Sequence, residues 1–70
     1  MIDRIEDLHS KLQKGESIKI LTSLPEYTTY ISRTDLIRID DNVLEIYRAN
    51  DSIVFINTDH IVMCCLIRRL

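Results

Sequence analysis

The spacing of the apolar residues changes abruptly at Gly15, and this change limits what the chain can fold into. Before Gly15, apolar residues recur every three to four positions, at Ile2, Ile5, Leu8 and Leu12. This is the period of an amphipathic helix, and glycine is a common residue at a helix end. After Gly15, apolar and polar residues alternate, which is typical of half-buried strands. The sequence therefore predicts one helix over residues 1–15, followed by β-structure.

Turn signals divide the remaining chain into five segments with strand character. These segments cover residues 17–23, 27–40, 43–49, 52–57 and 61–69. Asp and Asn favour tight turns because their side chains bond to nearby backbone groups, so Asp40, Asp41 and Asn42 predict one such turn. The alternation falters over residues 32–35, which predicts a bend in the long second strand.

Short connections between consecutive strands favour antiparallel pairing, and five twisted strands favour a strongly bent sheet or barrel. We expect a mostly β fold with one N-terminal helix and a five-stranded antiparallel small barrel. A chain of 70 residues allows one modest core, so residues 1–70 are expected to form a single domain. The helix covers residues 1–15 of that domain, and the barrel covers residues 17–70.

The last predicted strand indicates self-association. Residues 61–67 are apolar without interruption, so both faces of this strand need cover. A barrel interior covers one face, and a neighbouring subunit is expected to cover the other. The chain is also 46% hydrophobic, which is a large apolar supply for so small a core. We therefore expect a homo-oligomer.

Charge and composition exclude some classes of partner and location. Nine basic and eleven acidic residues are mixed along the chain, whereas a duplex-DNA binder usually carries clustered cations. Asp59 and His60 interrupt the apolar tail, so no membrane span is predicted. No signal-peptide pattern is evident, and the two cysteines suit a reducing compartment. The expected location is cytoplasmic.

The chain lacks a recognisable catalytic motif, and we expect neither an enzyme nor a bound cofactor. Cys64 and Cys65 lie near Asp59 and His60, but the spacing is not that of a metal site. Neighbouring strand residues point to opposite faces, so both thiols are expected to pack in the core or an interface, with no metal bound.

Several side chains have two possible roles on sequence alone. Tyr27 and Tyr30 are either strand residues half covered by the helix or aromatic platforms for a base. His60 either contacts a ligand, caps backbone groups in its turn or lies at a subunit contact. His9 lies beside the apolar stripe of the helix and is interpreted as structural.

Residues 54–64 (VFINTDHIVMC) resemble the second sequence motif of the Sm, Lsm and Hfq-like proteins. The matching positions are Val54, Phe55, Ile56 and Ile61, while Asn57 and Thr58 stand where the family has Arg-Gly. The first family motif is echoed by Asp41 and Asn42 and by the alternating residues Val43, Leu44 and Ile46. The order of one helix and five strands is also similar to that family.

This resemblance implies a ring-shaped homo-oligomer in which the fourth strand of one subunit pairs with the fifth strand of the next. The implied interface residues are Ile53, Phe55, Val62, Cys64 and Leu66. It also implies a single-stranded RNA site at the two turns, formed by Asp41, Asn42, Asn57, Thr58, Asp59 and His60.

Two functions are left open by the sequence. The first is a non-catalytic Sm-like module that holds single-stranded RNA, as the order of elements and the turn spacing suggest. The second is a structural or regulatory homo-oligomer that binds a protein partner and no nucleic acid. The acidic balance and the missing Arg-Gly favour this second function.

Overall fold

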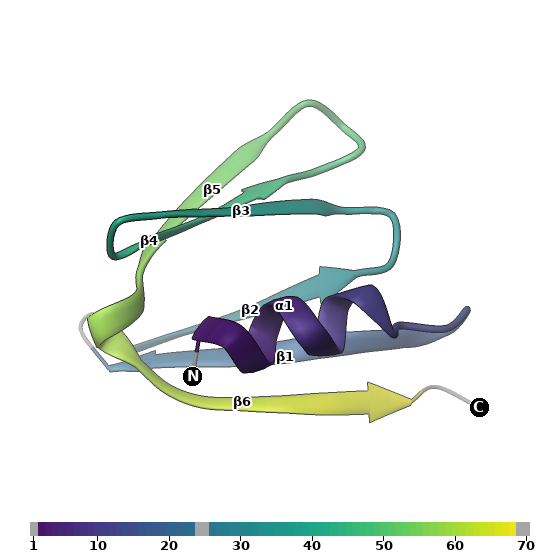
Figure 1. Ribbon diagram of the computed structural model, residues 1–70, viewed down its shortest axis with the longest axis horizontal. Helices are drawn as coiled ribbons and strands as arrows, with labels where there is room; N and C mark the ends of the chain where they lie inside the picture. The colour runs from purple at the N-terminus through teal and green to yellow at the C-terminus, as the bar shows by residue number, and fades with distance from the viewer. Residues whose placement is uncertain (1, 24–25, 69–70) are drawn as a thin grey trace.

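The structure is a computed structural model that describes residues 2–23 and 26–68. Its elements are α1 (Ile2–Ser10), β1 (Glu16–Ser23), β2 (Glu26–Ser32), β3 (Leu36–Asp40), β4 (Val43–Tyr47), β5 (Ile53–Asn57), the short 3-10 helix η1 (Thr58–His60) and β6 (Ile61–Arg68). The strands form two antiparallel sheets, ordered β2-β1-β6 and β3-β4-β5. Helix α1 lies along β1 and β2 (Figure 1). In the described ranges, no helix has the length and apolar character that crossing a membrane requires.

The predicted closed barrel is wrong, and the predicted long second strand is two strands. The chain turns between β2 and β3, where the Asp35 amide donates to the Ser32 carbonyl oxygen at 3.2 Å. The Ser32 amide in turn donates to the Asp35 carboxylate at 2.9 Å. These bonds occupy backbone groups that a continuous ladder would use. Over residues 2–23 and 26–68, six strands therefore replace the predicted five, and no ladder joins the two sheets into a barrel.

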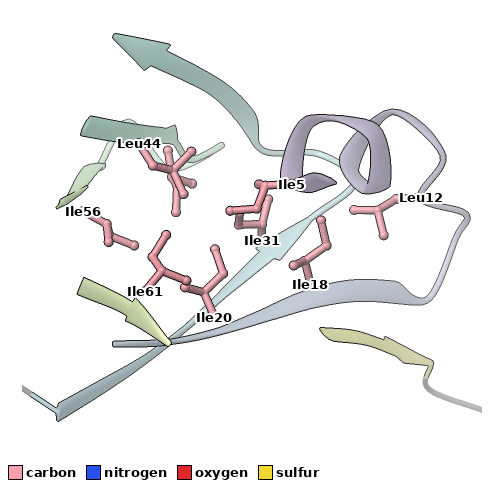
Figure 2. Packing of buried hydrophobic residues seen from close by; sticks show 9 residues of the cluster. Ile5, Leu12, Ile18, Ile20, Ile31, Leu44, Ile56 and Ile61 are labelled. Carbon is pink, nitrogen blue, oxygen red and sulfur yellow. The ribbon is translucent and has the colours of Figure 1, made fainter. Parts of the chain in front are cut away.

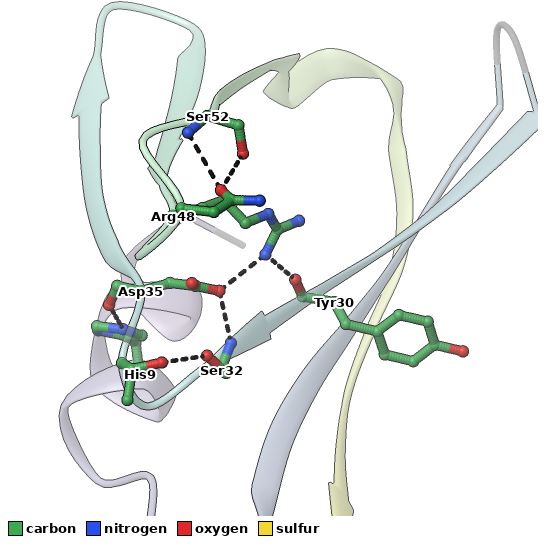
Figure 3. A network of polar contacts seen from close by, with 8 residues as sticks. His9, Tyr30, Ser32, Asp35, Arg48 and Ser52 are labelled. Carbon is green, nitrogen blue, oxygen red and sulfur yellow. Dashed lines mark hydrogen bonds and ion pairs between the residues drawn. The ribbon is translucent and has the colours of Figure 1, made fainter.

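A buried ion pair holds this turn in place (Figure 3). The Asp35 carboxylate accepts a hydrogen bond from Arg48 Nη1 at 2.7 Å, and Asp35 is only 4% exposed. The same guanidinium nitrogen donates to the Tyr30 carbonyl oxygen at 2.6 Å. From α1, His9 Nε2 donates to the Asp35 carbonyl oxygen at 2.8 Å. Because buried charge is costly unless paired, this network fixes the place where the strand breaks.

Branched aliphatic side chains, mostly isoleucine, fill the space between the sheets. The fully buried members are Ile5, Ile18, Ile20, Ile31, Leu44 and Ile46. Ile18 lies opposite Ile31 in the β1-β2 ladder, and Ile5 reaches them from α1 (Figure 2). Along β1, β2 and β4, buried and more exposed side chains alternate, so the buried residues of each strand lie on one face, as the period of two predicts.

The helix ends five residues earlier than predicted, at Ser10. Beyond it, the Lys11 amide donates to the Leu8 carbonyl oxygen and the Leu12 amide to that of His9, at 3.1 and 3.2 Å. These hydrogen bonds link residues three positions apart, as in a 3-10 turn, which winds the backbone more tightly than an α-helix. The tighter turn places Leu12, which is 7% exposed, in the core. Gly15 then adopts a φ of 85°, in the region that glycine enters without steric cost.

Candidate functional site

The structure brings together the two turns that the sequence singled out. Asp41 and Asn42 connect β3 to β4, and Asp41 has a φ of 53°. Thr58 opens η1, and its amide and its Oγ1 hydroxyl both donate to the Asn42 carbonyl oxygen, at 2.8 and 3.1 Å. Asn42 and Thr58 are therefore joined directly, although 16 positions separate them.

Side chains within the second turn shape η1. Asn57 Oδ1 accepts a hydrogen bond from the Asp59 amide at 2.9 Å, so Asn57 caps this short helix. The His60 carbonyl oxygen accepts from Ser23 Oγ at 3.4 Å, which attaches the turn to the end of β1. His60 is half-buried and Asp59 is exposed. Hydrogen bonds to backbone groups thus account for Asn57 and Thr58, and no hydrogen bond of the His60 imidazole is present among the described residues.

A groove of about 260 Å³ opens beside this turn. Its walls are formed by Thr22, Tyr27, Val54, Phe55, Ile56, Asn57 and His60. Apolar and aromatic walls with a few polar groups are the usual lining of small-molecule sites in proteins. Two of the predicted site residues, Asn57 and His60, therefore share one groove with Tyr27.

Sequence reasoning missed Thr22 as a member of this groove. Thr22 lies opposite Tyr27 in the β1-β2 ladder, so both side chains project from the same face. Its hydroxyl donates to the Tyr27 carbonyl oxygen at 3.2 Å. The pairing register of the β1-β2 hairpin carries this information, and alternation along each strand does not fix that register.

Carboxylates dominate the charge near the joined turns. Asp41 and Asp59 are exposed, and no ion pair to either one is present within residues 2–23 and 26–68. Asp40 is also exposed, and its carboxylate lies 3.7 Å from Arg38 Nη2. The local surface is therefore acidic, which disfavours close contacts with phosphate groups.

Four of the five residues assigned to a subunit interface are exposed. Ile53 and Phe55 project from β5, with exposures of 48% and 64%, while Val62 and Leu66 on β6 have exposures of 56% and 40%. Both strands lie at the edges of their sheets. An exposed apolar edge strand is a template for pairing with another chain.

Cys64 differs from the other assigned interface residues because it packs against the core. It lies opposite Ile20 in the β1-β6 ladder, whereas Cys65 lies opposite Lys19 and points to the other face. Burial, and secondly the neighbouring Cys65, raise the pKa of the Cys64 thiol. Both cysteines are free, and no cluster of three or more potential metal ligands occurs in the described part of the chain.

A β-bulge explains why β6 exposes two consecutive apolar residues. Thr22 pairs with Ile61 and Leu21 pairs with Met63, so Val62 has no partner opposite it. The extra residue shifts the alternation by one position. As a result, Ile61 is buried whereas Val62 and Met63 are both exposed.

Comparison of the chain with protein-family models, curated proteins and solved structures finds no match.

Proposed function

We propose that the protein is a non-catalytic, Sm-like homo-oligomeric module that holds single-stranded RNA at the joined turns. The observation that carries this proposal is the pair of hydrogen bonds from Thr58 to the Asn42 carbonyl oxygen. These bonds combine two polar turns into one surface beside a groove with aromatic walls. The Sm-like part of the proposal rests on the sequence resemblance of residues 54–64, in which Asn57 and Thr58 belong to the turn before β6.

The groove suits bases better than phosphates. Tyr27 is 52% exposed and offers a ring on which a base stacks, while Asn57 and His60 offer groups that bond to base edges. The carboxylates of Asp41 and Asp59 keep phosphates at a distance. RNA held mainly by its bases releases few counterions, so its affinity depends weakly on salt.

We expect self-association through β5 and β6, two of the four edge strands of the described sheets. Pairing β5 of one subunit with β6 of the next covers Ile53, Phe55 and Val62 and satisfies the free backbone groups of both strands. It also places the groove of each subunit, which Phe55 lines, next to the neighbouring subunit.

Fluorescence anisotropy with 5′-hydroxyl U-rich and A-rich oligonucleotides tests RNA binding. We expect binding at low salt that weakens less than about tenfold between about 50 and about 200 mM salt, since few phosphates are contacted. Tyr27→Ala should weaken binding by about tenfold through lost stacking. Leu36→Ala is the control, because Leu36 is 69% exposed and lines neither this groove nor the other hollow of the described structure. Absence of binding at low salt would eliminate this function.

A second candidate is a homo-oligomer that binds a protein partner and no nucleic acid. The observation in its favour is the acidic surface formed by Asp40, Asp41 and Asp59. A protein that self-associates but binds neither oligonucleotide would support this second function.

A further inference from the structure

A second hollow, of about 570 Å³, lies at the other end of the sheet β2-β1-β6. It forms where the connection from α1 enters β1 and where β2 turns into β3, at the right of Figure 1. The groove beside η1 lies at the opposite end of β1. The hollow's hydroxyl, aromatic and cationic groups come from Lys14, Ser17, Tyr30, Ser32, Arg33 and Thr34.

This hollow carries an excess of positive charge, which favours binding of an anion. Lys14 and Arg33 are exposed, and neither has an acidic partner in the ion pairs of the described residues. The carboxylate that lines the hollow, Glu16, is already engaged. Its Oε1 accepts from the Gln13 amide at 2.9 Å, and its Oε2 accepts from Arg68 Nε at 2.8 Å.

The strand register gathers the polar groups on one face. Ser17 lies opposite Ser32, and Tyr30 precedes Ser32 by two residues, so these three side chains share the outer face of the sheet. The Ser32 and Thr34 hydroxyl oxygens lie 3.0 Å apart, which places Thr34 beside them. Hydroxyl donors between two cations are suitable for the oxygens of a phosphate group.

We propose that this hollow binds the terminal phosphate of a nucleotide, with the base against the ring of Tyr30. Lys14 and Arg33 provide the charge. Ser17 and one hydroxyl of the Ser32–Thr34 pair donate to the remaining phosphate oxygens, since the other hydroxyl of the pair donates within it. The phosphate belongs either to a free mononucleotide or to the 5′ end of an RNA strand. The site is independent of the groove at the joined turns, because the two share no residue.

Amide chemical shifts of the ¹⁵N-labelled full chain test this site with three probes. These are uridine 5′-monophosphate, a 5′-phosphorylated oligouridylate, and the same oligonucleotide with a 5′-hydroxyl. We expect both phosphorylated probes to shift the amides of Gly15, Ser17 and Thr34. Tighter binding of the oligonucleotide would assign the site to RNA ends, and tighter binding of the mononucleotide would assign it to free nucleotides.

Charge-removing variants identify the cations. Lys14→Gln and Arg33→Gln should each weaken mononucleotide binding by about tenfold, the effect of losing one charge-assisted hydrogen bond. Lys11→Gln removes an exposed cation that is paired with Asp7, and it should leave binding unchanged. Tyr30→Ala should weaken binding of the mononucleotide but not of inorganic phosphate. Equal binding of the 5′-hydroxyl probe at these amides, or an equal loss in Lys11→Gln, would overturn the proposal.

Discussion

Thr58 donates two hydrogen bonds to the carbonyl oxygen of Asn42, from its amide at 2.8 Å and from its hydroxyl at 3.1 Å. The contact joins the β3-β4 turn to the break between β5 and β6. Two backbone groups, the Thr58 amide and the Asn42 carbonyl, and one side-chain group, the Thr58 hydroxyl, thus hold the two turns of the proposed RNA surface together. The substitution that removes only this hydroxyl is therefore informative.

We expect Thr58→Val to lower the free energy of unfolding by about 1 kcal/mol, the typical net value of one hydrogen bond. The amide bond to Asn42 remains, so the turn should persist with faster hydrogen exchange at residue 58. Urea unfolding and native-state exchange measure the two effects. Thr58→Ser keeps the hydroxyl and should retain wild-type protection; if Thr58→Ser exchanges as fast as Thr58→Val, the hydroxyl bond is not what holds the turn.

The ion pair between Asp35 and Arg48 should contribute strongly to stability. Asp35→Ala removes the acceptor of the Ser32 amide and the carboxylate that pairs with the half-buried Arg48 guanidinium, which then keeps its bond to the Tyr30 carbonyl oxygen. We expect the free energy of unfolding to fall by about 2 to 4 kcal/mol. Urea unfolding followed by far-ultraviolet circular dichroism measures this loss.

The pair formed by Arg38 and Asp40 is the matched control for this measurement. Both side chains are more than half exposed, and their charged atoms lie 3.7 Å apart. Asp40→Ala should change stability by less than about 1 kcal/mol, as is usual for exposed pairs. Similar losses for Asp35→Ala and Asp40→Ala would contradict the role assigned to the buried pair.

Core packing between the two sheets should depend on Ile46, which is fully buried on β4. Ile46→Ala should cost about 2 to 5 kcal/mol because it leaves a cavity between the sheets. Leu36→Ala on the neighbouring strand is the control, since Leu36 is 69% exposed and should change stability by about 0.5 kcal/mol or less. Thermal and urea unfolding should rank the two variants in this order, and the reverse order would contradict the placement of the core.

Cys64 should titrate above the ordinary thiol pKa of 9.0, because burial disfavours its thiolate. A folded-state pKa above the unfolded value means that the native protein holds the proton more tightly. The stability from this group is therefore present below pH 9.0 and is lost as the pH rises through the folded-state pKa.

The Cys65→Ser variant isolates this titration. It removes the smaller influence of the neighbouring thiol and retains the burial. Ultraviolet absorbance of the thiolate should give a midpoint above 9.0 in the folded variant and a lower midpoint in urea. A folded midpoint at or below the urea value would be inconsistent with a Cys64 side chain packed against the core.

Local chemistry in the sequence was sufficient to predict four of the strand segments and the turns between them, but not the division of residues 27–40 into β2 and β3. The alternation of residues 17–23 predicted β1, and Asp41 and Asn42 predicted the β3-β4 turn, where Asp41 has a positive φ. The break between β2 and β3 required more than local information. It depends on the pairing of Asp35 with Arg48, 13 positions away, and the faltering alternation showed only where it occurs.

The candidate site was predictable in part. The motif around Asn57 and Thr58 and the turn at Asn42 identified the segments that meet. The resemblance implied that both turns serve one RNA site, and the direct contact between Asn42 and Thr58 emerged only from the structure. Neither the Val62 bulge nor the membership of Thr22 in the groove follows from alternation within one strand, because both depend on the register between strands.

Sedimentation velocity of the wild-type chain at micromolar concentration tests whether the exposed edge strands pair between subunits. If β5 of one subunit pairs with β6 of the next, a closed oligomer should form. We expect one sharp boundary with a mass that is an integral multiple of the single chain, unchanged on dilution across the micromolar range. A stable monomer at these concentrations would show that β5 and β6 do not pair between subunits.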